Sequence, residues 1–140
     1  MPENKDSENL IGIDYGDTNI GVALGRAGYV TPLEVITTHD AGTAINKIAR
    51  LAIENKVNTF IVGLATTESG KETHQSLETR KFAKLLKIMT KKPIKFVSEY
   101  ASSKDAHAER EFFGASTSRK ALQDHIAAAV ILKRYFDENL

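Results

Sequence analysis

Two acidic residues follow apolar segments, where burying a carboxylate costs free energy unless the carboxylate has a partner or a functional role. Asp14 ends the segment LIGID, and Glu99 comes just after the segment IKFV. A carboxylate at the end of a buried strand loses hydration unless it emerges at a sheet edge or meets a cation. Ligands of open α/β sheets bind beyond the carboxyl ends of strands, so both acids are candidate metal ligands. Taken singly, Asp14 also suits a turn and Glu99 a solvated strand end.

A third acid, Asp124, continues the apolar face of a helix. Positions 124, 128, 131 and 135 share one helix face, and the last three are Ala, Ile and Tyr. The run Ala127–Ala129 allows this helix to approach the sheet closely, which would bring Asp124 toward Asp14 and Glu99. The alternative is that Asp124 has no role at a metal site and is favoured there only by the helix dipole, which stabilises an acid near the start of a helix.

Convergence of Asp14, Glu99 and Asp124 would create a site for hard divalent cations. Mg²⁺ and Mn²⁺ prefer oxygen ligands, and a pair of such ions can cleave phosphodiester bonds by activating water and stabilising the leaving oxygen. Three protein acids are enough, because the substrate phosphate supplies further ligands. We predict that these three residues are both metal ligands and catalytic residues. Asp17 is a further candidate ligand, although a turn role is favoured.

Basic residues near these acids are candidate substrate contacts. Arg119 and Lys120 lie about one turn before Asp124, where they can grip a phosphate near the metals. Lys71, beside Gly70, can reach substrate if its loop closes. A larger group follows that loop and is more simply explained as a solvated helix face; it consists of Arg80, Lys81, Lys84, Lys87, Lys91 and Lys92.

The hydrophobic pattern indicates the elements that must position these residues. Strands are expected as a hairpin over 10–13 and 20–24, and then at Tyr29–Thr37, Thr59–Leu64 and Ile94–Val97. Helices are expected from Ala41 to about Asn55, after the polar loop Ala65–Gly70, from Ser102 to Gly114, and from about Ala121. The second helix has a predicted apolar stripe of Leu77, Phe82, Leu85, Leu86 and Met89. The expected fold is α/β, with a mixed five-stranded sheet flanked by helices.

Composition limits the remaining possibilities. With no cysteine, the chain has no disulfide, thiolate metal site or cysteine nucleophile, and its histidines lack metal-ligand spacing. Its 140 residues suit one domain over 1–140, with about residues 1–8 as a flexible N-terminus. A polar start and the lack of an apolar run near ~18 residues favour the cytoplasm. Since the net charge is only +1, any nucleic acid would bind a local basic patch.

Three segments resemble the YqgF/RuvX family of Holliday-junction-resolvase-like proteins, and the resemblance covers nearly the whole chain. They are IGIDYGDTNIGVALG, FIVGLATTESGKETHQSLETRKFAKLL and DHIAAAVILKRYF. The resemblance implies an RNase H-like fold and places the family's acidic residues at Asp14, Glu99 and Asp124. Many family members are described as nucleases for the 5′ end of pre-16S ribosomal RNA, which implies a role in ribosome biogenesis.

The chain departs from the family at two places. The family usually has an Asp-Glu-Arg run where this chain has Ser98, Glu99 and Tyr100, and often a basic residue where Thr18 and Asn19 stand. An Arg beside the metals can hold a phosphate with two hydrogen bonds, whereas Tyr cannot. We therefore expect reduced substrate affinity or rate unless another cation substitutes.

The leading hypothesis is a metal-dependent endonuclease acting on structured RNA, with ribosomal precursor particles and a second copy of the chain as candidate partners. Two alternatives stay open: a Holliday-junction (branched DNA) resolvase-like endonuclease, and a non-catalytic nucleic-acid-binding or ribosome-assembly factor on the same fold. Asp14-x-Gly16-x-Thr18 also resembles the phosphate loop of actin-like ATPases, but those enzymes need a second domain to enclose ATP. The segment Gly63–Lys71 lacks the spacing of a nucleotide-binding P-loop.

Overall fold

The computed structural model describes residues 8–16, 18–67, 69–99 and 119–138, with side chains in the last range from Ile126 onward. Its strands are β1 (Asn9–Asp14), β2 (Asn19–Arg26), β3 (Tyr29–Thr37), β4 (Thr59–Ala65) and β5 (Ile94–Glu99). Its helices are α1 (Ala41–Glu54), α2 (His74–Thr90) and α4 (Arg119–Glu138). These elements confirm the predicted ones to within about two residues. Almost all of the flexible N-terminus expected over residues 1–8 lies outside the described residues. The helix expected from Ser102 to Gly114 lies entirely outside them.

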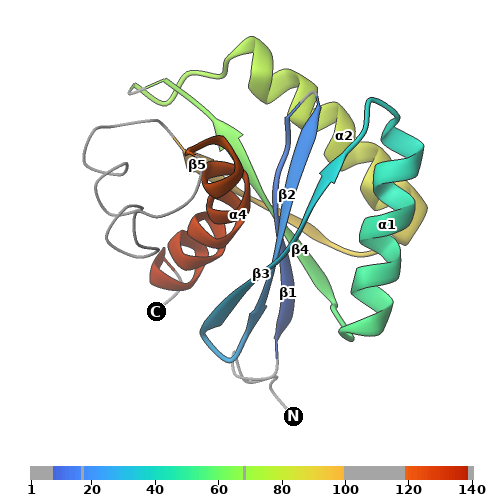
Figure 1. The fold of residues 1–140 in the computed structure, drawn as a ribbon. Coiled ribbons are helices and arrows are strands. Elements are labelled where there is room, and N and C mark those ends of the chain that lie inside the picture. Colours follow the sequence, from blue (N-terminus) through green and yellow to red (C-terminus); the bar gives the residue numbers. More distant parts are fainter. Residues whose placement is uncertain (1–7, 17, 68, 100–118, 139–140) are drawn as a thin grey trace.

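The five strands form one mixed sheet in the order β3-β2-β1-β4-β5 (Figure 1). β1 pairs antiparallel with β2 and parallel with β4, and β4 pairs parallel with β5. β1 is therefore central, and the carboxyl ends of β1, β4 and β5 lie at the same edge of the sheet, here called the carboxyl edge. This arrangement confirms the mixed five-stranded sheet that the sequence predicts.

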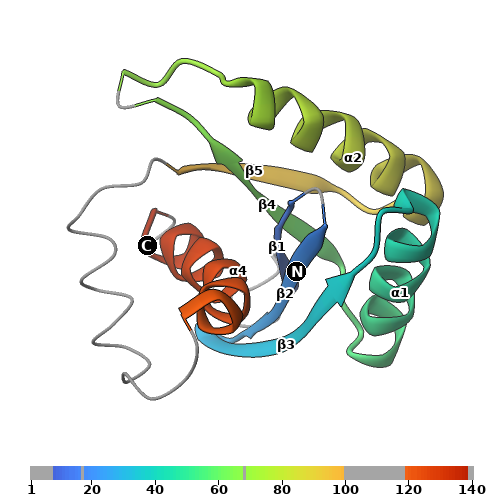
Figure 2. The ribbon, with the colours of Figure 1, turned by 45° about the horizontal axis from the view of Figure 1, so that its top comes forward.

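Helices cover both faces of the sheet (Figure 2). Side chains alternate along a strand, so Ile11 and Ile13 of β1 join the core beneath α1 and α2, whereas Leu10 joins the core beneath α4. By the same alternation, Gly12 and Asp14 belong to the α4 face. The central strand thus delivers Asp14 to the side of the sheet that carries the last helix.

α4 lies very close to the sheet, as the alanine run predicts. A Cβ atom added at Gly12 would lie 2.5 Å from Leu132 Cγ and 2.8 Å from the Ala128 carbonyl oxygen. Farther along α4, Phe136 lies against Gly25, which pairs with Leu10 near the start of β1. α4 therefore runs antiparallel to β1, and its first turns lie toward the carboxyl edge.

The predicted apolar stripe of α2 is wrong at three of its five positions. Phe82 and Leu86 are buried, but Leu77, Leu85 and Met89 are 50%, 39% and 50% exposed. The buried face is completed instead by Ala83 and by two hydroxyl residues, Ser76 and Thr79. Their hydroxyls bond to backbone carbonyls of the same helix end, Ser76 to Thr73 at 2.8 Å and Thr79 to Gln75 at 2.9 Å. Because these polar groups are satisfied locally, they can be buried, and the larger apolar residues remain outside.

No helix within the described ranges is long and apolar enough to cross a membrane.

Candidate active site

Asp14 is the last residue of the central strand and is half-buried. The parallel register pairs Ile13 with Val62, so the next residues along, Asp14 and Gly63, lie side by side. Neighbouring strands are about 4.8 Å apart. The carboxylate therefore starts at the carboxyl edge, directly beside a residue that has no side chain.

Glu99 ends β5, two strands away from Asp14, and is also half-buried. Its backbone pairs with Ala65, but its side chain lies over Gly63, because a Cβ atom added at Gly63 would be 2.9 Å from Glu99 Oε2. The same added atom would lie 2.5 Å from Ile131 Cδ1 of α4. The Glu99 carboxylate thus faces α4 and lies over the strand adjacent to Asp14.

These positions bring two of the three predicted acids to one edge and one face of the sheet. The third, Asp124, lies in α4 one turn before Ala128, on the part of the helix nearest the carboxyl edge. Its side chain is outside the described residues. Among the side chains that the structure does describe, there is no group of three or more acidic or histidine residues placed to hold a metal ion.

The loop after β4 folds back on itself beside Glu99. The Thr66 amide donates to the Glu99 carbonyl at 2.7 Å, and the Thr67 and Lys71 backbones bond across the loop at 2.9 Å. The Lys71 amide also donates to Thr67 Oγ1 at 3.0 Å. Lys71 itself is exposed, and the substrate contact expected of it stays a prediction.

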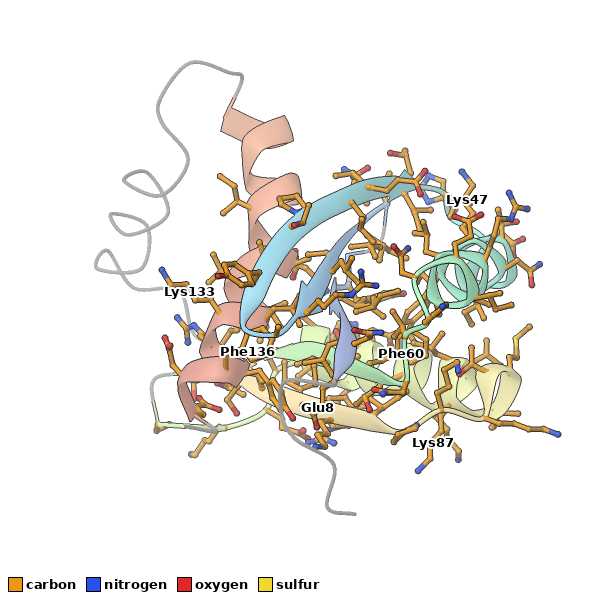
Figure 3. The ribbon with its side chains drawn as sticks, turned by 90° about the horizontal axis from the view of Figure 1, so that it is seen from below. Glu8, Lys47, Phe60, Lys87, Lys133 and Phe136 are labelled. Carbon is orange, nitrogen blue, oxygen red and sulfur yellow. The ribbon has the colours of Figure 1, made fainter. Side chains whose placement is uncertain are left out.

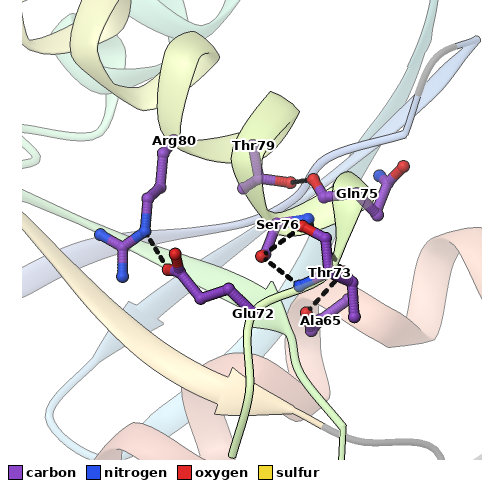
Figure 4. A network of polar contacts seen from close by, with 7 residues as sticks. All are labelled: Ala65, Glu72, Thr73, Gln75, Ser76, Thr79 and Arg80. Atoms are coloured by element: carbon purple, nitrogen blue, oxygen red, sulfur yellow. Dashed lines mark hydrogen bonds and ion pairs between the residues drawn. The ribbon is translucent and has the colours of Figure 1, made fainter.

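The start of α2 holds the backbone next to Asp14, through residues that the sequence reasoning did not single out. Gln75 Nε2 donates to the Tyr15 carbonyl at 3.0 Å, and the Tyr15 ring stacks on Phe82 with centroids 4.7 Å apart. Thr73 and Ser76 cap the helix reciprocally, with the Ser76 amide donating to Thr73 Oγ1 at 3.1 Å and the Thr73 amide to Ser76 Oγ at 2.8 Å (Figure 4). The sequence signal for this cap is Thr73 itself, because threonine is a favoured N-cap residue. Gln75 has no such local signal.

A further cation that the sequence reasoning missed stands beside β5. Arg134 of α4 is half-buried, and its Nη1 donates to the Ser98 carbonyl at 3.5 Å. That carbonyl belongs to the peptide that joins Ser98 to Glu99. Arg134 therefore places a positive charge close to the segment where the family pattern has an arginine and this chain has Tyr100.

The side chains of the remaining predicted residues are outside the part of the chain that the structure describes. Arg119 and Lys120 are the first residues of α4, and their side chains are outside the described set. Asp17 and Tyr100 also lie outside it. The roles expected for these four residues stay predictions.

Solved structures define the class to which this fold belongs. Thermus thermophilus RuvC in complex with a Holliday junction substrate matches with a TM-score of 0.60 at 14% identity, covering 94% of this chain and 96% of that one. The Fowlpox virus Holliday junction resolvase matches with a TM-score of 0.56 at 14% identity, covering 94% and 99%. The fold is that of the RNase H-like resolvases, as the sequence resemblance predicted.

The sequence comparisons place the chain within this class. Residues 8–138 match the family described as "RuvX: Holliday junction resolvase", and the chain belongs to that family. A relative from Ruegeria sp. (strain TM1040), named "Putative pre-16S rRNA nuclease", is 36% identical over 133 residues, 91% of this chain and 83% of that protein. A relative of the same name from Bordetella parapertussis is 33% identical over 139 residues, 98% of this chain and 96% of that protein.

Proposed function

We propose that this protein is a metal-dependent nuclease whose active site consists of Asp14, Glu99 and Asp124. The observation that carries the proposal is the position of the Glu99 carboxylate, which lies over Gly63 next to Asp14 on the face covered by α4. Position 124 belongs to the part of α4 that approaches this same edge. Three acids distant in sequence thus come from three elements that meet at one edge of the sheet.

The donor set fits Mg²⁺ or Mn²⁺. Both described acids offer only carboxylate oxygens, which hard divalent cations prefer, and the missing side chain at Gly63 leaves room for the Glu99 carboxylate beside β1. Asp14, Glu99 and Asp124 would hold the ions through their carboxylate oxygens. Bound there in a pair, the ions would supply an activated water and stabilisation of the leaving oxygen.

The substrate that the relatives' names support is pre-16S rRNA, and we assign cleavage at its 5′ end, in the cytoplasm and on ribosomal precursor particles, as the biological reaction. Lys71 projects from the loop next to Glu99, and Arg119 and Lys120 begin α4. These cations would bind phosphates on either side of the cleaved bond. Arg134 is the cation that would compensate for Tyr100, because it already lies beside the Ser98–Glu99 peptide.

Metal binding and cleavage test this proposal directly. We expect Asp14→Asn, Glu99→Gln and Asp124→Asn each to lower Mn²⁺ affinity and the cleavage rate by more than about 100-fold, since even outer partners of metal ligands contribute about 10–100-fold. Asp137→Asn is the matched control, because Asp137 is an exposed acid at the far end of the same helix. Calorimetric Mn²⁺ titration and cleavage of pre-16S rRNA and of a four-way DNA junction provide the measurements.

Two outcomes would refute the proposal. One is a wild-type protein that cleaves neither substrate with Mg²⁺ or Mn²⁺, and the other is a set of three variants that behave like Asp137→Asn. Preference for the junction over the rRNA would instead favour the resolvase-like alternative, to which the RuvC fold points.

Tyr100 in the place of the family's arginine favours a second candidate, a non-catalytic ribosome-assembly factor. The two candidates differ in what Asp14→Asn does in cells. If this variant abolishes function while RNA affinity is unchanged, chemistry is required and the binding-only function is excluded.

A further inference from the structure

A shallow groove of about 240 Å³ runs between α2 and the edge strand β5. Its lining includes Lys84 and Lys87, which share one face of α2 and are about one turn apart, and Phe96 of β5. Phe96 is 39% exposed although it is the largest apolar side chain of its strand. We call this feature the α2–β5 groove, and its lining residues are Arg80, Ala83, Lys84, Lys87, Ile94 and Phe96.

One end of the α2–β5 groove brings a guanidinium group over an aromatic ring. The guanidinium carbon of Arg80 lies 5.0 Å from the centroid of the Phe96 ring. Arg80 also forms an ion pair with Glu72 (Figure 4), which restrains the position of its guanidinium group. Aromatic rings and guanidinium planes are the two kinds of surface on which unpaired nucleic-acid bases stack.

The rest of the groove is positively charged. The two described acids of α2 and the segment just before it form local ion pairs, Glu72 with Arg80 and Glu78 with Lys81 at 3.3 Å. Within the described part of the chain, no acidic side chain forms an ion pair with Lys84 or Lys87. Lys87 extends away from α2 into solvent (Figure 3), so it is free to meet a polyanion.

The groove leads toward the proposed active site. β5 runs from Ile94 and Phe96 in the groove to Glu99 at the carboxyl edge. Glu72, the ion-pair partner of the groove residue Arg80, is bridged to Thr66 of the loop beside Glu99. Phe96 and Glu99 are on opposite faces of the strand, which is the outermost strand of the sheet. A flexible single strand in the groove can therefore pass around this edge and reach Glu99.

From these features we infer that the α2–β5 groove binds a single-stranded segment of the nucleic acid that flanks the cleaved bond. An unpaired base stacks on Arg80 and Phe96, while Lys84 and Lys87 contact consecutive phosphates. This inference rests on the proposed nuclease function but adds a binding site remote from the metal ligands.

Charge favours a nucleic acid over a second copy of the chain as the occupant. The outer side of α2 exposes Leu77, Ile88 and Met89, which a protein partner could cover. A symmetric contact between two α2 helices, however, would bring the same row of lysines together from both copies. A polyanionic strand neutralises that row instead.

Binding of a labelled oligouridine, followed by fluorescence anisotropy in EDTA, tests the inference without any cleavage. We expect the double variant Lys84→Glu, Lys87→Glu to bind at least about 10-fold more weakly than wild type. The slope of log affinity against log salt should decrease by about 1.4, since each phosphate contact on a single strand contributes about 0.7. The matched control is the double variant Lys47→Glu, Arg50→Glu, which should leave the affinity nearly unchanged. Both residues are exposed on α1, and Lys47 is labelled in Figure 3.

A second variant separates stacking from charge. Phe96→Leu retains an apolar side chain on β5 but removes the ring, and we expect at least about fivefold weaker binding with an unchanged salt slope. The same titrations with a single-stranded DNA of matched length show whether the groove distinguishes ribose from deoxyribose.

The inference is overturned if the two double variants bind the oligonucleotide equally well. It is also overturned if light scattering shows a dimer that Ile88→Glu dissociates, because a second copy then covers α2. Asp14→Asn should leave oligouridine binding intact. Loss of cleavage in that variant, together with unaltered groove binding, therefore reports on the active site alone, so the two proposals can fail independently.

Discussion

At Gly63 the lack of a side chain leaves space that two other residues use. An added Cβ atom would lie 2.5 Å from Ile131 Cδ1 and 2.9 Å from Glu99 Oε2. Gly12 faces the same helix, but there the three atoms nearest to the added one belong to Leu132 and the Ala128 backbone, and none of them to an acidic side chain. Comparing substitutions at the two glycines therefore distinguishes the effect of crowding against α4 from the effect of displacing a candidate metal ligand.

We predict that Gly63→Ala lowers Mn²⁺ affinity and cleavage far more than Gly12→Ala does. Both variants should lose about 1–3 kcal/mol of unfolding free energy, because each forces α4 away from a closely packed strand. Only Gly63→Ala also pushes the Glu99 carboxylate from its place. Urea denaturation and Mn²⁺ titration, made at a temperature where both variants are folded, provide the comparison; equal Mn²⁺ affinities would contradict the prediction.

At the scale of elements, the sheet could be predicted because its strands are short apolar runs between clear breaks. The carboxyl-edge rule then placed Asp14 and Glu99 together without any knowledge of packing. The α2 stripe could not be predicted in this way. Sequence spacing does not show that Ser76 and Thr79 satisfy their hydroxyls within the helix, nor that Phe96 lies on an outermost strand and remains exposed.

Residues of the candidate site could be proposed from the sequence only where their signals are local. The acids end strands or extend a helical stripe, and both patterns are visible in the sequence. Gln75 and Arg134 act at long range, since they meet Tyr15 and Ser98 across 60 and 36 residues respectively. Contacts of this kind depend on the relative placement of helix and sheet, which no local pattern specifies.

The N-terminus of α2 offers a prediction at the same scale. Thr73 Oγ1 accepts from the Ser76 amide at 3.1 Å and donates to the Ala65 carbonyl at 3.0 Å, so one hydroxyl both caps the helix and ties it to the end of β4. We expect Thr73→Ala to lower the unfolding free energy by about 1–2 kcal/mol, the upper part of the range for such caps. Thr73→Ser, which retains the hydroxyl, should lose much less.

Urea denaturation measures the loss of unfolding free energy in Thr73→Ala, and amide hydrogen exchange shows which part of the protein is destabilised. The amides of the first turn of α2 should exchange faster in Thr73→Ala, whereas those of α1 should not change. A uniform acceleration across both helices would show that the hydroxyl has no specific role at this junction.

For the molecule as a whole, one tyrosine connects parts of the chain that are distant in sequence. Lys95 Nζ of β5 donates to Tyr135 Oη of α4 at 3.1 Å, and Tyr135 Oη donates to Glu8 Oε2, just before β1, at 3.4 Å. The Lys95 ammonium also lies 5.4 Å from the centroid of the Tyr135 ring. The hydrogen bond with Tyr135 raises the pKa of Lys95 above its usual value of 10.5.

We predict that Tyr135→Phe lowers the pKa of Lys95 and reduces the unfolding free energy at neutral pH by no more than about 1 kcal/mol, because the lysine is exposed. A raised pKa in the folded state stabilises the fold fully below the unfolded pKa of about 10.4, and this contribution is lost as pH rises through the folded pKa. The contribution of the Lys95–Tyr135 hydrogen bond to the unfolding free energy should therefore be equal at pH 7 and pH 9. It should decline above pH 10.5, the usual pKa of a lysine. NMR titration of Lys95 and urea denaturation test this, with the exposed Tyr29→Phe as the control; an unchanged Lys95 pKa in Tyr135→Phe would show that the hydroxyl does not hold the ammonium.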